Sequence, residues 1–201
     1  MTDNPREIWP PAKIFYIHSM LFATNSAMQS FDVLNAEFEG VEGDVIFEQV
    51  GALNFSKILD GLQNVVLQAG VISKYFWPIR SSHHWRGHAL REAFGISDDH
   101  PLKSRSLRDA IEHFDERLDR YLEHEVIGVV LPEYVGPRPQ DSGVSGHFFR
   151  AYFIEEGVFR LLNEEYKIAP IADALLAIHS QLLDFDAKGG TFPGVKAPQP
   201  K

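Results

Sequence analysis

The sequence contains no cysteine. That absence excludes disulfide bridges and thiolate-bound metal, and it fits a reducing compartment. The sequence also lacks any run of about 18 apolar residues, the length that a membrane-spanning helix requires. Residues 1–7 do not show the basic and then apolar pattern of a signal peptide. We therefore expect a soluble cytoplasmic protein with no membrane partner.

Basic residues are also scarce. Lysine and arginine number 19 against 28 aspartates and glutamates, so the net charge of −9 argues against a broad basic surface that captures nucleic acid. Residues 80–108 reverse this balance and form a basic island, made up of Arg80, Arg86, Arg91, Lys103, Arg105 and Arg108. The histidines at 83, 84, 88 and 100 lie within it. A basic island in an acidic chain is a candidate anion site, and we assign Arg86, Arg91 and Arg105 to phosphate or RNA binding. Chance clustering on a solvated face is the alternative.

Apolar side chains recur at helical spacing through the first 124 residues. We expect helices over 10–38, 44–76, 82–94 and 102–124. Their starts and stops are predicted from Pro10, Asp44, Pro78, Gly95 and Pro101. The fourth helix has a core stripe of Leu107, Ile111, Phe114, Leu118, Tyr121 and Leu122. These four helices together predict a helical bundle.

The pattern changes after residue 124. A short β-branched run over 126–131 leads into a loop rich in proline and glycine over 132–146. Two apolar runs then flank Glu155-Glu156-Gly157, a short connection with glycine last, and they predict a β-hairpin over 147–162. We expect a last helix over 170–186 and a flexible tail over 188–201.

Arg108 and His113 are the candidate pair for chemistry. On a helical wheel at about 100° per residue they flank the polar face of the fourth helix, away from its core stripe. An imidazole transfers protons near neutral pH, and a guanidinium offers forked donors to a phosphate. The pair suits metal-free RNA cleavage, in which His113 assists the 2′-hydroxyl or the leaving oxygen while Arg108 holds the phosphate. The alternative is a solvated face on which Arg108 pairs with Glu112, and Asp109 with His113.

The run Arg-Asp-Ala-Ile-Glu-His over 108–113 resembles the arginine–histidine motif of the HEPN superfamily. The resemblance covers roughly residues 11–124. It implies a small helical bundle, usually dimeric, and in many members a metal-independent ribonuclease of toxin–antitoxin or defence systems. It also implies that Arg108 and His113 are catalytic, that Asp109 is their polar partner, and that the motifs of two protomers meet in one cleft.

The expected fold class is therefore mostly α. It is a HEPN-like helical bundle over about 11–124 with an added C-terminal β-hairpin and final helix, in one domain over 1–187. The expected function is metal-independent RNA cleavage by a homodimer that needs no cofactor, with an antitoxin-like protein as a further partner. One alternative is a non-catalytic HEPN-fold module that binds RNA or a nucleotide. The other is a metal-binding helical bundle that uses His84 and His88, although we expect no metal, since no thiol completes such a site.

Overall fold

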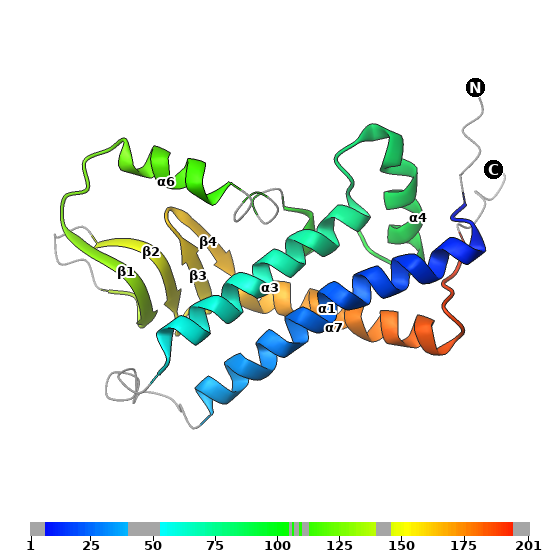
Figure 1. Cartoon of the computed structure of the whole chain (residues 1–201), viewed down its shortest axis with the longest axis horizontal. Coiled ribbons are helices and arrows are strands. Elements are labelled where there is room, and N and C mark those ends of the chain that lie inside the picture. Colours follow the sequence, from blue (N-terminus) through cyan, green and yellow to red (C-terminus); the bar gives the residue numbers. More distant parts are fainter. Residues whose placement is uncertain are drawn as a thin grey trace.

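Two long helices, α1 (Pro10–Phe38) and α3 (Phe55–Phe76), lie side by side along the molecule in the computed structural model (Figure 1). The structure describes residues 7–39, 53–104, 106, 109, 113–139 and 146–194. Helix α1 has proline in its first turn and the predicted bounds. Helix α3 begins later than predicted, because the Asn54 side chain accepts a hydrogen bond from the Lys57 backbone N–H at 3.1 Å and caps it. The expected cap, Asp44, lies outside the described residues.

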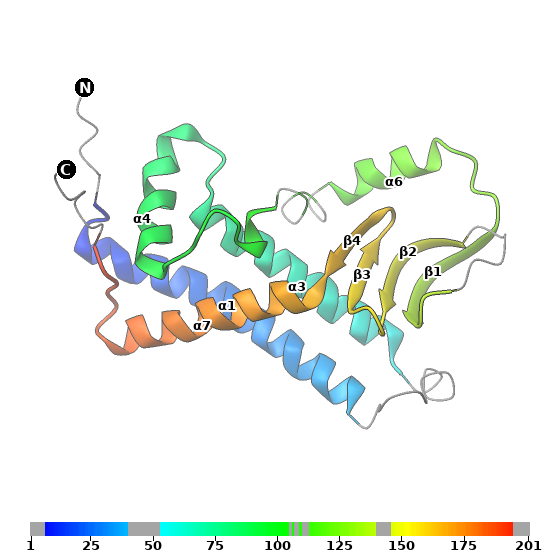
Figure 2. The ribbon, with the colours of Figure 1, turned by 180° about the vertical axis from the view of Figure 1, so that it is seen from behind.

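The main core lies between α1, α3 and α7 (Ile168–Ala187), and Figure 2 shows α7 along the back of α1. Its central side chains are nearly all aliphatic: Ile17, Met20, Ile58, Leu62, Val65, Leu175, Ile178 and Leu182. Each such burial contributes about 1.5–3 kcal/mol to folding. A shorter helix, α4 (His84–Phe94), packs against the end of α3 and stops at Gly95, whose φ of 65° is left-handed. The predicted glycine stop is therefore confirmed.

Helix α7 is long and apolar enough to cross a membrane, judged by length and composition alone. Core helices of soluble proteins often pass the same test. One side of α7 is buried against α1 and α3, and its other side carries exposed Leu176 and Leu183. The cytoplasmic location remains a prediction.

A four-stranded mixed sheet stands at one end of the helices (Figure 1). Its strands, in spatial order, are β1 (Val129–Gly136), β2 (Gly146–Phe153), β3 (Val158–Leu161) and β4 (Glu164–Lys167). The predicted hairpin is confirmed as the antiparallel pair β2–β3, with Gly157 at a φ of 61° in its turn. Strand β1 pairs in parallel with β2, and β4 pairs antiparallel with β3. The hairpin is thus the middle of a larger sheet.

The expected fold class, a helical bundle with a β-hairpin and last helix added to it, is wrong. The described residues combine helices with a four-stranded sheet, and α7 belongs to the main core rather than to an addition. Side chains from the sheet enter the same core, among them Phe159 and Leu161 of β3 and Tyr166 of β4. The sequence did not reveal β1 as a strand because its pairing partner begins ten or more residues later, and no local turn signal marks a parallel pair.

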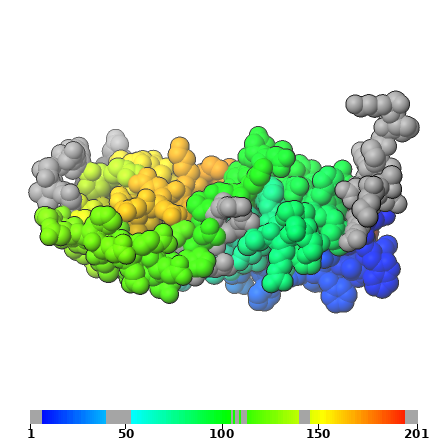
Figure 3. Space-filling view, turned by 90° about the horizontal axis from the view of Figure 1, so that it is seen from above, coloured from blue at the N-terminus to red at the C-terminus, as the bar shows by residue number. Residues whose placement is uncertain are grey.

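Helix α6 (Phe114–Leu122) corrects a second expectation. The apolar spacing predicts one core helix over 102–124, but Pro101–Lys103 forms a 3-10 turn, and a turn at His113 separates the helical residues Ser106 and Asp109 from α6. No residue of α6 is buried, and Leu122 is 52% exposed. Figures 1 and 3 show α6 above the sheet, at the opposite end of one elongated face from α4. On the apolar side of α6, Phe114 packs against the edge of the main core and Tyr121 contacts the His147 ring of β2, so this side joins the helix to both the core and the sheet.

The chain after α7 is packed as far as the structure describes it. Phe192 is buried against Phe94 and Phe185, and the Lys13 ammonium donates to the Phe192 carbonyl at 2.8 Å. The predicted flexible tail over 188–201 is therefore wrong for 188–194, because an aromatic side chain there finds a site in the core. Residues 195–201 lie outside the described part.

Candidate functional site

His113 lies in a turn immediately before α6, with a non-helical φ of −124°. Its side chain is 53% exposed, and its Nδ1 lies 3.7 Å from a carboxylate oxygen of Glu116. Arg108 and Arg105 lie outside the described residues. The prediction that His113 lies within a helix is therefore wrong, and the helical wheel that relates its position to Arg108 does not apply to it. That residue precedes the first turn of α6, where backbone N–H groups lack helical partners.

Asp109, the neighbour of Arg108 in the sequence, lines an open hollow of about 750 Å³ at the corner between α3 and α4. We call this the corner hollow, and it is lined by Trp77, Pro78, Ile79, His84, Arg91, Lys103 and Asp109. Two cations of the predicted basic island, Arg91 and Lys103, lie here together with His84 from the same stretch. The hollow thus joins part of the motif segment to part of the basic island.

The cations of the corner hollow also have partners within the protein. Arg91 donates from Nη1 to the Phe76 carbonyl at the end of α3, and its guanidinium lies 5.8 Å from the centre of the Trp77 ring. The Lys103 ammonium lies 3.3 Å from a carboxylate oxygen of Asp98. Arg91 therefore stabilises the last turn of α3, where carbonyls lack helical partners, besides presenting charge to the hollow.

Arg86 does not line the corner hollow. Its Nη2 donates to the Lys74 carbonyl at 2.9 Å, and its guanidinium lies 5.9 Å and 5.8 Å from the ring centres of Tyr16 and Tyr75. These contacts join α1, α3 and α4. Of the three arginines assigned to phosphate, the structure places Arg91 at the hollow and gives Arg86 a packing role.

His84 and His88 share α4 but differ in surroundings. His84 lines the corner hollow, whereas His88 Nδ1 lies 3.7 Å from a carboxylate oxygen of Glu92. Within the described residues, no three histidine, aspartate or glutamate side chains are placed to hold a metal ion together. The metal-binding alternative therefore lacks a third ligand in this part of the chain.

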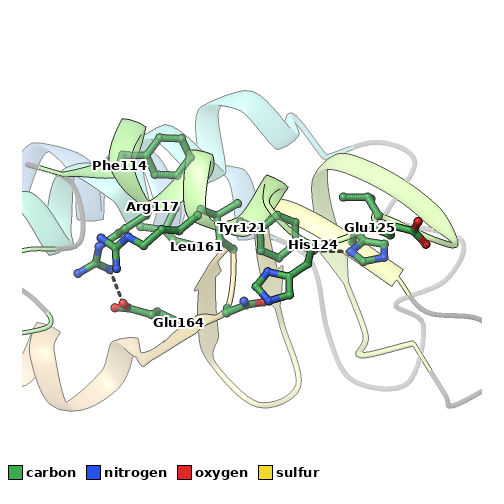
Figure 4. Close-up of a pocket in the computed structure, with 12 residues that line it drawn as sticks. Phe114, Arg117, Tyr121, His124, Glu125, Leu161 and Glu164 are labelled. Carbon is green, nitrogen blue, oxygen red and sulfur yellow. Dashed lines mark hydrogen bonds and ion pairs between the residues drawn. The ribbon is translucent and has the colours of Figure 1, made fainter.

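A second cavity, of about 360 Å³, lies between α6 and the turn that joins β3 to β4. We call it the α6 cavity, and Figure 4 shows its lining. Its residues are Phe114, Arg117, Arg120, Tyr121, His124, Glu125, Val126, His147, Leu161, Leu162, Asn163 and Glu164. The sequence does not reveal this cavity, because the apolar spacing of Phe114 and Tyr121 predicts a bundle core and no local pattern predicts β4. No local sequence pattern indicates that α6 and the distant turn between β3 and β4 face each other.

An ion pair closes one end of the α6 cavity. Arg117 Nη1 lies 2.5 Å from Glu164 Oε1, and the Tyr166 hydroxyl donates to the other carboxylate oxygen at 2.6 Å. Burial favours a raised pKa for Glu164, but the hydrogen bonds from Tyr166 and Arg117 outweigh it and lower the pKa below its ordinary value. Burial, together with the Glu164 carboxylate, raises the pKa of Tyr166. Glu164 is therefore a stable anion that neutralises Arg117.

A histidine with both ring nitrogens engaged lies on the opposite wall. His147 Nε2 donates to the Ile127 carbonyl at 3.0 Å, because a carbonyl oxygen can only accept. In the tautomer that carries its proton on Nε2, the Nδ1 atom accepts from the Tyr121 hydroxyl. This chain of hydrogen bonds holds Tyr121 of α6 against β2, and it sets the width of the cavity.

Comparison with protein-family models, curated proteins and solved structures finds no match for this chain.

Proposed function

We propose that this protein binds RNA and cleaves it without a metal ion, with Arg108, Asp109 and His113 as the catalytic segment. One observation carries the proposal. Asp109, next to Arg108 in the sequence, lines the same hollow as His84, Arg91 and Lys103. The two cations Arg91 and Lys103, at a hollow that also holds the sequence neighbour of Arg108, suit a phosphodiester substrate.

The proposed chemistry is an internal transfer at phosphorus. The 2′-oxygen forms a bond to the adjacent phosphorus while the bond from phosphorus to the 5′-oxygen breaks. His113 takes the proton of the 2′-hydroxyl or gives one to the departing 5′-oxygen, and Arg108 stabilises the charge that grows on the phosphate. The products are a 2′,3′-cyclic phosphate and a 5′-hydroxyl. DNA lacks the nucleophile and is not a substrate.

The resemblance to HEPN proteins supports a homodimer in which two such segments form one cleft. An exposed imidazole next to Glu116 suits this arrangement, because a single protomer leaves one side of His113 open to solvent. An antitoxin-like protein that covers the corner hollow is the further partner consistent with that resemblance.

The second candidate is a module that binds RNA or a nucleotide without cleaving it. His113 lies beside Glu116, and Arg91 donates to the Phe76 carbonyl. Because both side chains already have partners within the protein, these contacts favour a structural role over a catalytic one. In this case the corner hollow holds phosphate through its cations, and the motif residues contribute no chemistry.

The test is cleavage of a mixed-sequence, fluorescently labelled RNA by purified protein in EDTA, with DNA of the same sequence alongside. We expect His113→Ala to lower the rate by about 100-fold or more, the usual effect of removing an acid–base group. His88→Ala is the matched control, since His88 is 60% exposed and lies 3.7 Å from Glu92, much as His113 lies from Glu116.

If RNA stays intact, or if His113→Ala cleaves as fast as wild type, the ribonuclease proposal is wrong. Binding of the same RNA, measured by fluorescence anisotropy, then decides the second candidate. That candidate predicts a weaker affinity for Lys103→Gln and no change for His113→Ala.

A further inference from the structure

The α6 cavity exists because α6 rests on the sheet without being buried by it. The helix has a marked apolar side, yet none of its residues is buried. Phe114 and Tyr121 from that side line the cavity together with Val126, Leu161 and Leu162. Phe114 packs against the main core and Tyr121 against His147, but the space between them is open, so part of the apolar surface of α6 stays unburied.

The backbone conformation of Leu162 is a second, independent indication that this cavity is a binding site. It is the one non-glycine residue with positive φ among the described residues, at 52°, and its side chain is only 5% exposed. Such a backbone costs about 1–2 kcal/mol in any residue but glycine. Two hydrogen bonds hold it, from its N–H to the Phe149 carbonyl at 3.0 Å and from Arg160 Nε to its own carbonyl at 2.6 Å. Glycine would avoid the cost but would remove the side chain that lines the cavity.

The cavity lining includes an arginine, Arg120, whose charge is not paired with a carboxylate of the described residues. Arg117, Arg120 and His124 follow each other at three- and four-residue spacing along one side of α6 and its end. Arg117 is neutralised by Glu164, but Arg120 forms no ion pair with a described residue and uses only Nε, on the Glu116 carbonyl at 3.3 Å. Glu125 lies at the far end of the cavity from the Arg117–Glu164 pair (Figure 4).

We propose that the α6 cavity binds a small organic anion with a flat apolar body. The body contacts Phe114, Tyr121 and Leu161, and the carboxylate or phosphate of the ligand pairs with Arg120 and His124. A volume of about 360 Å³ lies at the lower end of the range of about 300–1,000 Å³ for small-molecule sites. This cavity shares no lining residue with the corner hollow, so the inference does not depend on the proposed ribonuclease activity.

The experiment compares two probes of one shape, the anion 2-naphthoate and the neutral 2-naphthamide, by titration calorimetry of the full-length protein. We expect 2-naphthoate to bind one site per chain with a Kd of about 0.1–1 mM, as its size allows, and 2-naphthamide to bind about five- to tenfold more weakly. Arg120→Gln should bring the affinity for 2-naphthoate down to that for 2-naphthamide. Binding of 2-naphthamide should be unchanged in this variant, which shows that the cavity is intact.

Two further variants locate the site. Val126→Trp fills the partly exposed edge of the cavity and should abolish binding of both probes. Lys103→Gln, in the corner hollow, is the control and should change neither affinity. Because Arg120 and Val126 are exposed, both variants should keep the circular dichroism spectrum and melting temperature of wild type.

The proposal is overturned by any of three results. The first is no binding of 2-naphthoate at millimolar concentration. The second is equal affinity for the two probes, which would indicate an apolar site without anion selection. The third is binding that is lost in Lys103→Gln and kept in Arg120→Gln or in folded Val126→Trp, which would place the probe in the corner hollow.

Discussion

Gly87 of α4 allows the closest approach between α4 and the end of α3. A Cβ atom at this position would lie 2.5 Å from the Phe76 carbonyl oxygen and 2.5 Å from Cδ of Pro78. Non-bonded atoms pack best at about 3.5–4.0 Å, so Gly87→Ala must push α4 outward by roughly 1 Å. Neither neighbour can turn aside, because one is backbone and the other is a proline ring. The displaced helix carries His84 and Arg91 of the corner hollow.

The size of the effect follows from two opposing contributions. Alanine favours the helix over glycine by about 0.8–1 kcal/mol. Overpacking in a filled site costs about 1–3 kcal/mol, and a clash with rigid backbone belongs at or above the upper end. We therefore expect Gly87→Ala to lower the free energy of unfolding by about 2 kcal/mol. For a chain of this size, that corresponds to a melting temperature lower by about 4–8 °C.

Urea and thermal unfolding, with helix content followed by circular dichroism, measure this change in the free energy of unfolding. Gly61→Ala in α3 is the matched control, because its Cβ would lie 3.3 Å from Cγ of Leu34, a side chain that can shift. We expect this control to change stability by less than about 1 kcal/mol. A Gly87→Ala protein as stable as wild type, or more stable, would refute the close approach of α4 to the end of α3.

Three further predictions concern stability, pH and assembly. Arg91→Ala should lower the free energy of unfolding by about 1–2 kcal/mol, through loss of the bond to the Phe76 carbonyl and the contact with Trp77; unchanged urea stability would argue against this capping role. Burial lowers the pKa of His179 from 6.5, so the folded protein holds its ring neutral, 2.9 Å from the Thr24 hydroxyl. The unfolded chain takes up the proton more readily, so stability should fall as pH drops below about 6.5. Burial lowers the pKa of His100 as well, so His179→Gln should reduce the fall of melting temperature in that window without abolishing it. Sedimentation equilibrium at micromolar concentration should give a homodimer, and a monomer throughout would contradict the proposed composite cleft.

The elements predicted correctly are those with signals inside their own sequence. Pro10 begins α1, Gly95 ends α4, and Gly157 forms the turn of the β2–β3 hairpin. Each acts through backbone conformation, which a residue and its near neighbours decide. The apolar spacing of α7 likewise marked a helix, close to its observed bounds of Ile168–Ala187.

The candidate site was predictable in its residue types but not in its geometry. The basic island and the arginine–histidine motif are visible in the sequence, and Asp109, Arg91 and His84 do meet at the corner hollow. The turn at His113 was not visible, because an apolar stripe at helical spacing runs on through Phe114 without a proline or glycine to interrupt it. Periodicity indicates that a helix exists, and it locates the end of a helix poorly.

Local sequence signals therefore predict α1, α4, α7 and the hairpin, since these depend on interactions between near neighbours in the chain. The local excess of positive charge is likewise visible in the sequence. Three features are evident only in the folded chain: β1 and β4 extend the hairpin into a sheet, α7 joins the main core, and α6 leaves a cavity above the turn at Leu162. Those outcomes depend on side chains far apart in the chain, such as Arg117 with Glu164 and Tyr121 with His147. The amphipathic pattern of a segment indicates that one of its sides packs against an apolar surface. Which surface this is depends on the tertiary structure.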